Sequence, residues 1–101
     1  MNDITAQELK ERLDNSETLY LIDVREEYEN EEFNIGGKLI PLGSLPSSLN
    51  ELEHLKENEL ILYCRSGARS GNAKLFLEGL GFNKVRNLIG GMMVWRSTFK
   101  G

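Results

Sequence analysis

The chain has little of several residue types, and each scarcity excludes a class of protein. It holds one cysteine in 101 residues, so an internal disulfide and a zinc site built from four thiolates are both excluded. No apolar run approaches the roughly 20 residues that a membrane-spanning helix needs. Residues 1–5 lack the basic and apolar segments that begin a signal peptide. We therefore expect a reducing, cytoplasmic setting and no membrane partner.

Positive charge is scarce in the first part of the chain. Residues 1–59 carry 5 basic and 15 acidic side chains, whereas residues 60–101 carry 7 basic and 1 acidic. The net charge of −4 argues against nucleic acid as the main partner. The cationic second part either favours an anionic substrate or is cancelled in space by the acidic first part. The sequence leaves both interpretations open.

No linker, repeat or low-complexity segment divides the chain, which predicts a single domain over residues 1–101 with one modest core. Short apolar runs predict buried strands at residues 19–22, 39–40, 60–63 and 85–88. Segments with helical patterns lie between these runs. Strands and helices that alternate in this way indicate an α/β domain with a mostly parallel sheet.

Three patterns place the main helices. Thr5 and Glu8 have the spacing of a capping box, in which the two side chains satisfy free backbone N–H groups. Leucines spaced by three and four residues predict a continuous helix over residues 46–55. A third helix, ending at a left-handed Gly81, is expected to bury one stripe of side chains, namely Ala73, Phe76, Leu77 and Leu80.

The remaining aromatic, sulfur-containing and histidine side chains have mostly structural interpretations. Tyr28 and Phe33 are expected to anchor an acidic, otherwise solvated helix over residues 26–32. His54 is expected to be a solvated surface residue rather than the base of a Cys–His pair. Three side chains near the C-terminus are expected in the core rather than around a substrate: Met92, Met93 and Trp95.

Cys64 stands at the end of the apolar run 60–63 and opens the loop 65–70, after which a helical pattern begins. A single buried cysteine is usually a small hydrophobic residue without chemistry. Here two arginines and a helix N-terminus follow it, and both lower the pKa of a thiol and so favour the nucleophilic thiolate. The loop would also lie beyond the carboxyl end of a strand, where ligands of such sheets bind. We therefore interpret Cys64 as reactive.

The spacing of the loop limits the anion that it can hold. Protein tyrosine phosphatases carry Cys-x5-Arg, usually preceded by histidine, but here Tyr63 precedes the cysteine. Arg69 falls one place short of the phosphatase arginine, whose position is occupied by Ser70. A loop that is one residue shorter forms a smaller cradle, which suits a single added sulfur better than a phosphate.

Four blocks of the sequence, in order, resemble the single-domain rhodaneses, which are thiosulfate sulfurtransferases. Residues 64–70 are similar to the active-site loop of that family, and residues 21–29 to its Asp-Val-Arg segment. Residues 34–42 and 81–95 resemble its Gly-His-Ile-x-Gly-Ala stretch and its C-terminal signature. The usual histidine is absent, because Phe33 or Asn34 stands there, and we expect this change to affect packing more than chemistry.

The resemblance implies a rhodanese-like three-layer α/β domain, whose mostly parallel sheet of about five short strands has helices on both faces. It implies that Cys64 takes sulfur from thiosulfate or a similar anionic donor as a persulfide, and passes it to cyanide, a thiol or a protein acceptor. It implies no cofactor and no metal. Arg65 and Arg69 are expected to point outward and hold the sulfonate. The substrate-binding loop comprises Arg65, Ser66, Gly67, Ala68, Arg69 and Ser70.

Asp23 and Arg25 follow the first buried strand. They could pair near the thiol loop, and the resemblance supports a structural role for them around the pocket.

Two other functions remain to be separated from thiosulfate turnover. The first is a sulfur-relay or interaction module that receives persulfide sulfur from a protein. The second is a small phosphatase or arsenate reductase, which the loop length disfavours. With a single cysteine there is no resolving thiol, so a cycle between two thiols of the same chain is excluded.

Overall fold

The computed structural model describes residues 1–100, and a parallel four-stranded sheet in the order β2-β1-β3-β4 forms its centre. The strands are β1 (Tyr20–Asp23), β2 (Lys38–Leu39), β3 (Leu60–Tyr63) and β4 (Val85–Asn87). The described residues form four strands, one fewer than the five or so that were expected. A further extended residue, Ile4, pairs with Leu88 through an isolated bridge only.

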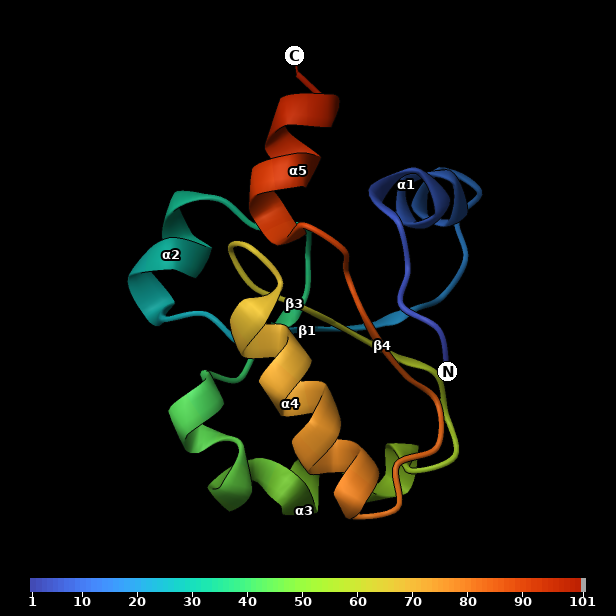
Figure 1. The fold of residues 1–101 in the computed structure, drawn as a ribbon, viewed down its shortest axis with the longest axis vertical. Helices are drawn as coiled ribbons and strands as arrows, with labels where there is room; N and C mark the ends of the chain where they lie inside the picture. Colours follow the sequence, from blue (N-terminus) through green and yellow to red (C-terminus); the bar gives the residue numbers. More distant parts are fainter. Residues whose placement is uncertain (101) are drawn as a thin grey trace.

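Helices cover both faces of the sheet, as expected. Figure 1 shows α1 and α5 on one side of the strands and α3 and α4 on the other. The α-helices are α1 (Ala6–Asp14), α2 (Glu27–Glu32), α3 (Leu49–Leu52), α4 (Ala68–Gly79) and α5 (Gly91–Thr98). Three 3₁₀ turns lie around α3: η1 (Leu42–Ser44), η2 (Pro46–Ser48) and η3 (Glu53–Leu55). None of these helices within residues 1–100 is both long enough and apolar enough to cross a bilayer.

The central position of β3 in the sheet explains why its sequence is an uninterrupted apolar run. Leu60 and Leu62 pack into the core on the α3 and α4 side, and Ile61 and Tyr63 pack into the core on the α1 and α5 side. All four side chains are fully buried. A central strand of a parallel sheet is covered on both faces, so apolar residues follow one another instead of alternating with polar ones.

The continuous helix expected over residues 46–55 is not formed. The segment consists of η2, the single turn α3 and η3. The 3₁₀ helix has three residues per turn, which suits the three-residue spacing of Leu49, Leu52 and Leu55. Leu52 and Leu55 are buried, and Leu49 packs against the same core. The leucines therefore reach the core as expected, but over a less regular backbone.

Helix α4 buries a narrower stripe than its sequence predicts. Ala73 and Leu77 are fully buried, whereas Phe76 and Leu80 are 38% and 41% exposed. The buried face instead continues through Ser70, which lies close to the thiol, and Gly81 adopts the expected left-handed conformation.

Two other expectations about burial are also wrong in part. Tyr28 is 69% exposed and does not anchor α2, although Phe33 does pack against the core. Met92 and Trp95 are buried, as expected, but Met93 is 55% exposed.

Helix α1 begins with half of the expected capping box. The Thr5 hydroxyl accepts a hydrogen bond from the Glu8 backbone N–H at 3.1 Å. The Glu8 carboxylate, however, accepts a hydrogen bond from Arg86 at 2.9 Å. Arg86 on β4 thus binds the Glu8 carboxylate, which in a complete capping box would accept a hydrogen bond from the Thr5 backbone N–H.

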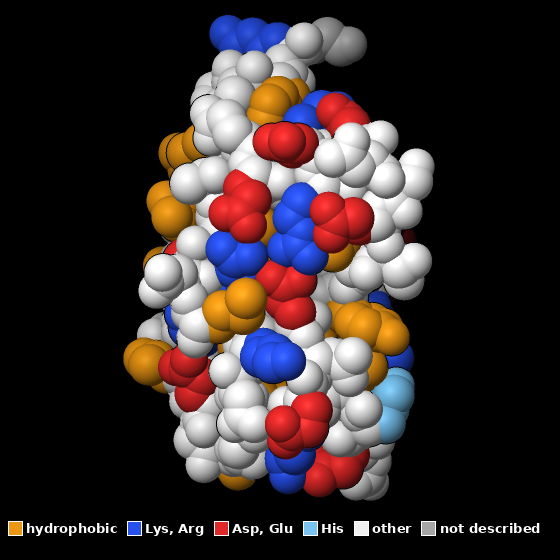
Figure 2. All heavy atoms as spheres, turned by 90° about the vertical axis from the view of Figure 1, so that its right-hand side faces the viewer, with side chains coloured by type: hydrophobic (Ala, Val, Ile, Leu, Met, Phe, Trp, Pro, Cys, Tyr) orange, Lys and Arg blue, Asp and Glu red, His pale blue; other side chains and the backbone are white. Residues whose placement is uncertain are grey.

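The two oppositely charged parts of the sequence cancel in space. Ion pairs join the acidic residues 1–59 to the basic residues 60–101 across α1, α2 and the sheet edge, as in Arg69–Glu29, Arg86–Glu8, Arg86–Glu59, Lys74–Asp3 and Arg96–Glu32. Figure 2 shows acidic and basic side chains interspersed on the face at the right of Figure 1. Of the two interpretations of the charge pattern, the structure favours cancellation.

The register of the sheet decides which loops meet. Asp23 at the end of β1 lies opposite Tyr63 at the end of β3, and Leu62 lies opposite Asn87 at the end of β4. Because the strands are parallel, the segments that follow Asp23, Tyr63 and Asn87 leave the same edge of the sheet. Cys64 is the first residue beyond β3 at this edge.

Candidate active site

The Cys64 thiol lies at the base of the loop that joins β3 to α4, and its residue is fully buried. Gly67 adopts φ +102° just before α4 begins at Ala68, a conformation that a residue with a side chain rarely adopts. This turn brings the backbone of the loop back over the sulfur. The Gly67 N–H donates to Cys64 Sγ at 3.1 Å.

Ser70, in the first turn of α4, completes the contacts to the sulfur. Its backbone N–H lies 3.4 Å and its hydroxyl oxygen 3.3 Å from Cys64 Sγ. Ser70 is itself fully buried. The sulfur therefore faces N–H and O–H groups, which suits an anion better than a neutral thiol.

These contacts determine the acidity of the thiol. Burial by itself raises the pKa of Cys64, because it penalises the charged form. Hydrogen bonds outweigh burial and hold the pKa below its ordinary value; their donors are the Ser70 hydroxyl and the amides of Ser70, Gly67 and Ser66. The direction of this shift agrees with the expected thiolate, which stays a prediction. The largest favourable contributions come from the hydrogen-bond donors of the loop, and the Arg69 guanidinium also interacts favourably with the Cys64 thiolate.

Arg69 does not point freely outward, contrary to expectation. Its Nη1 and Nη2 atoms donate to Oε1 and Oε2 of Glu29 at 2.8 and 2.9 Å. The hydrogen bond from Arg69 lowers the pKa of Glu29 to about 2. This pair joins α4 to α2 across the mouth of the loop, so an anion that binds Arg69 must compete with a carboxylate.

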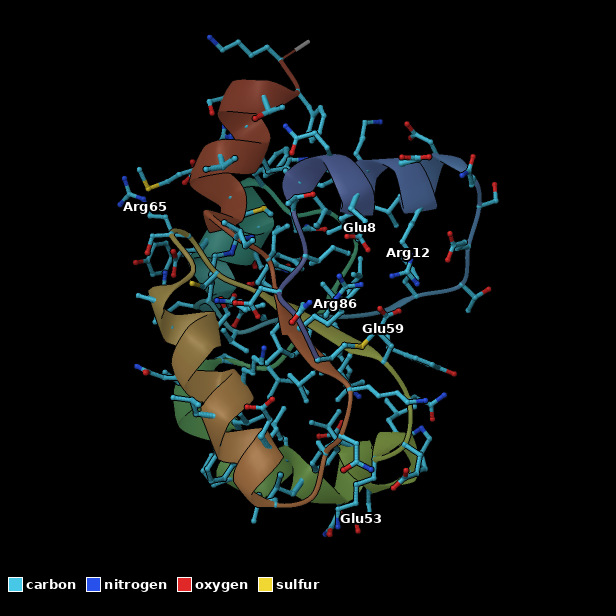
Figure 3. All side chains as sticks on the ribbon, turned by 45° about the vertical axis from the view of Figure 1, so that its right-hand side comes forward. Glu8, Arg12, Glu53, Glu59, Arg65 and Arg86 are labelled. Atoms are coloured by element: carbon cyan, nitrogen blue, oxygen red, sulfur yellow. The ribbon has the colours of Figure 1, made fainter. Side chains whose placement is uncertain are left out.

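Arg65 is exposed and forms no ion pair within residues 1–100. Figure 3 shows it on the outer side of the loop, far from the cluster of Glu8, Arg12, Glu59 and Arg86. It borders a cavity of about 380 Å³ between α2 and α5, whose other lining residues include Tyr28, Phe33, Met92, Met93 and Arg96. Arg65 is therefore the loop cation that is available to an incoming anion.

Asp23 and Arg25 form the pair that the sequence suggested. Arg25 Nε and Nη2 donate to the two carboxylate oxygens of Asp23, both at 2.9 Å, and the Arg25 N–H donates to Oδ1 at 3.0 Å. Asn30 Nδ2 donates to Asp23 Oδ2 at 2.9 Å, and Arg25 also donates to the Phe33 carbonyl. The buried pair thus ties the end of β1 to Asn30 within α2 and to Phe33 at its C-terminal end.

The N-terminus of α5 supports the thiol loop from its other side. The Met92 and Met93 N–H groups donate to the carbonyls of Cys64 and Arg65, both at 2.9 Å. The approach is close because Gly91 has no side chain: a Cβ there would clash with the Cys64 carbonyl and lie 2.6 Å from that of Arg65. The Gly90-Gly91 pair therefore has a specific structural role beside the site.

Sequence reasoning missed two residues around the thiol. The sequence predicts that Glu29 is part of a solvated acidic run, but Glu29 binds Arg69. The sequence places Asn87 in the C-terminal segment that resembles the family but predicts no contact with the thiol loop, although Asn87 contacts both Gly67 and Ser70. Glu29 lies 40 positions from Arg69, and Asn87 lies 17 positions from Ser70. No local pattern in one sequence reveals such pairs.

His54 is exposed on η3, as expected for a solvated histidine. Across residues 1–100, no group of three or more His, Cys, Asp or Glu side chains is arranged to hold a metal ion.

Comparisons with known proteins show the family of the chain. A family model described as "Rhodanese-like domain" matches residues 5–98. "Putative sulfurtransferase YtwF" of Bacillus subtilis (strain 168) is 40% identical over 101 residues, which cover 99% of this chain and 95% of that protein. "Putative sulfur carrier protein YrkF" of the same organism is 37% identical over 94 residues, or 92% of this chain and 50% of that protein.

A solved structure gives the same result. The crystal structure of a rhodanese-like domain protein from Staphylococcus aureus matches with a TM-score of 0.85 at 34% identity, over 94% of this chain and 91% of that chain. The family match covers nearly the whole chain, and the fold has the expected parallel sheet with helices on both faces. The chain belongs to the rhodanese-like family of sulfurtransferases.

Proposed function

We propose that this protein transfers a sulfane sulfur from thiosulfate, or a similar anionic donor, to cyanide or a thiol through a persulfide on Cys64. The observation that carries the proposal is the set of three hydrogen-bond contacts, from Gly67 and Ser70, that converge on Cys64 Sγ. They favour an anionic sulfur in a buried position. A reducing, cytoplasmic setting fits a chain with a single thiol.

In the charging step, the Cys64 thiolate attacks the outer sulfur of thiosulfate. The sulfur–sulfur bond of the donor breaks, and sulfite leaves with the bonding electron pair. Arg65 meets the sulfonate first because it is exposed and unpaired among the described residues. Arg69 follows by exchanging Glu29 for the donor anion. The amides of Ser66, Gly67 and Ala68, with Ser70, hold the persulfide anion.

In the discharging step, cyanide or a thiolate attacks the outer sulfur of the persulfide. The bond between the two sulfurs breaks, and its electron pair returns to Cys64 Sγ, which leaves as the stabilised thiolate. The same hydrogen bonds that help to form the thiolate make it a good leaving group. Because the chain has one cysteine, the acceptor must be another molecule.

A sulfur-relay function is the second candidate. It is favoured by the relative whose name is "Putative sulfur carrier protein YrkF". In this case Cys64 would receive its sulfur from a persulfide on a protein donor and would turn over thiosulfate negligibly. The loop and its persulfide would be the same, and only the donor and acceptor would differ.

Intact mass separates these functions. The protein is incubated with thiosulfate, its mass is measured, and cyanide is then added and thiocyanate assayed. We expect a gain of one sulfur atom, its loss with thiocyanate formation, and neither in Cys64→Ala. Absence of both adduct and thiocyanate would overturn thiosulfate turnover and favour the relay. Hydrolysis of an aryl phosphate by the same preparation would instead indicate a phosphatase.

A further inference from the structure

Asn87, the last residue of β4, contacts the thiol loop at two points. Its side-chain nitrogen Nδ2 donates to the Gly67 carbonyl at 3.0 Å. Its side-chain oxygen Oδ1 accepts a hydrogen bond from the Ser70 hydroxyl, with the two oxygens 2.5 Å apart. The backbone N–H of Asn87 donates to Asp3 at 3.0 Å. Asn87 is thus fixed on the sheet side and reaches the two residues that bind the sulfur.

The orientation of the Asn87 amide is determined by its partners. The Gly67 carbonyl can only accept a hydrogen bond, so the amide nitrogen must face it. The oxygen Oδ1 then necessarily faces Ser70 and can only accept a hydrogen bond from it. Reversing the amide would place two acceptors against each other at Gly67. The Ser70 hydroxyl is therefore the donor in its contact with Asn87.

A serine hydroxyl has one proton, yet the Ser70 hydroxyl has two possible acceptors. Asn87 Oδ1 lies at 2.5 Å and Cys64 Sγ at 3.3 Å. When the proton is directed to Asn87, a lone pair of the Ser70 oxygen faces the sulfur and can accept a hydrogen bond from a neutral thiol. When Cys64 is a thiolate, the same proton is needed by the sulfur. The two acceptors compete for it.

We propose that Asn87 is a positioning residue that competes with Cys64 for the Ser70 proton and thereby limits how strongly Ser70 stabilises the thiolate. Asn87 does not contact the sulfur: its Oδ1 acts on the sulfur through the Ser70 proton, and its Nδ2 only holds the Gly67 carbonyl. Its effect has two sides. A more basic thiolate is the better nucleophile in the charging step, whereas a less basic one leaves more readily in the discharging step. Asn87 sets the balance between the two.

Charged groups around the thiol do not supply this control. They comprise two ion pairs and one exposed cation: Arg69 with Glu29, Asp23 with Arg25, and Arg65. On β4 and α5, the arginines 86 and 96 are paired with acidic side chains. The hydrogen bonds to Cys64 Sγ come from Gly67 and Ser70, and none comes from these charged side chains. The Ser70 proton is the hydrogen-bonding group beside the sulfur that can change its partner.

The test measures the thiol itself, so its outcome is separate from sulfur transfer, although the functional meaning rests on the proposed function. The rate of alkylation by iodoacetamide and the thiolate absorbance are followed against pH in the full chain. Asn87→Leu keeps the size of the side chain but removes Oδ1, and with it the Nδ2 that binds the Gly67 carbonyl; the Ser70→Ala background below isolates the part that runs through Ser70. Asn87→Leu frees the Ser70 proton for the sulfur, and we expect about a tenfold larger ratio of thiolate to thiol at a given pH.

A double-mutant cycle then asks whether Asn87 acts through Ser70. In the Ser70→Ala background, Asn87→Leu should leave the titration of Cys64 unchanged. An equal shift in both backgrounds, or no shift in either, would overturn the proposal. The matched control is Asn83→Leu, which removes an exposed asparagine that binds Glu57 beyond the other end of β4. It should leave the titration as in the original chain.

A second measurement covers the case in which Asn87→Leu does not fold. The S–H stretch of the neutral thiol is recorded by infrared spectroscopy at acidic pH, in the original chain and in Asn87→Ser. We expect a lower frequency in the original chain, because its Cys64 thiol donates to a Ser70 oxygen whose own proton is held by Asn87. An identical frequency in the two proteins would contradict the proposed competition.

Discussion

Glu29 holds both terminal nitrogens of Arg69 in a two-point ion pair, with N–O distances of 2.8 and 2.9 Å. The same carboxylate accepts the Glu26 backbone N–H at 3.0 Å, which fixes it at the start of α2. An acidic residue of the first half of the chain thus occupies a cation of the thiol loop. Glu29 therefore competes with the proposed anionic donor for binding to Arg69.

The first prediction concerns this competition. Glu29→Gln should lower the KM for thiosulfate about threefold, because the donor no longer displaces a carboxylate from a partly exposed arginine. Arg69→Ala should raise KM more than it lowers the rate of sulfur release. Steady-state kinetics with cyanide as the acceptor measures both. Glu32→Gln, which removes an exposed partner of Arg96, is the control and should leave KM unchanged. An unaltered KM in Glu29→Gln would refute the competition.

The second prediction concerns the buried pair of Asp23 and Arg25, whose side chains are 0% and 6% exposed. Asp23→Asn should lower the free energy of unfolding by about 3 kcal/mol, since it leaves the Arg25 guanidinium buried without a counterion. Urea unfolding followed by circular dichroism measures the change. Asp14→Asn removes an exposed partner of Lys10 and should cost less than about 0.5 kcal/mol. Equal effects of the two substitutions would show that the buried pair has no special structural importance.

The third prediction concerns Glu59, which lies between Arg12 and Arg86 in the cluster labelled in Figure 3. The hydrogen bond from Arg12, assisted by Arg86, outweighs burial and holds the pKa of Glu59 below its ordinary value. A carboxyl whose pKa is lower in the folded state adds stability above the unfolded pKa, and this stability is lost as the pH falls.

Glu59→Gln should therefore be less stable than the original chain at pH 7. It should also lose less stability as the pH falls below about 4.3, the ordinary pKa of a glutamate. Urea unfolding at a series of pH values measures both effects. Glu53→Gln, which removes an exposed partner of Lys56, is the control and should change the free energy of unfolding at pH 7 by less than about 0.5 kcal/mol. Parallel curves for Glu59→Gln and the original chain would contradict the prediction.

The fourth prediction compares two glycines. Gly91 has φ +54° and would place a Cβ against the carbonyls of the thiol loop. Gly91→Ala should cost about 2 kcal/mol or more and slow persulfide formation, because the loop must move. Gly79, at the end of α4, has open space around its Cβ position. Gly79→Ala should stabilise the protein by about 0.5 kcal/mol and charge with sulfur normally. Normal charging in a folded Gly91→Ala variant would show that α5 does not position the loop.

The sequence by itself determined the elements whose signals are local. An uninterrupted apolar run marks β3 because a central parallel strand is covered on both faces, and the Cys64 loop follows from its place between that run and a helix. Asp23 and Arg25 lie two positions apart, so their pairing was within reach of sequence reasoning. The narrow buried stripe of α4 and the broken helix at residues 46–55 could not be predicted from the sequence. The surrounding core decided how far each helix extends and which side chains it buries.

Only the tertiary structure decided what surrounds the thiol. The parallel sheet brings the ends of β1, β3 and β4 to one edge, and this places Glu29 on Arg69 and Asn87 on Ser70. Each contact joins residues that are far apart in sequence, so no periodic pattern or short spacing in the sequence predicts it. Cys64 could be proposed as the nucleophile from the sequence because its features are contiguous. The groups that surround the Cys64 loop are not contiguous, and only the folded sheet brings them together.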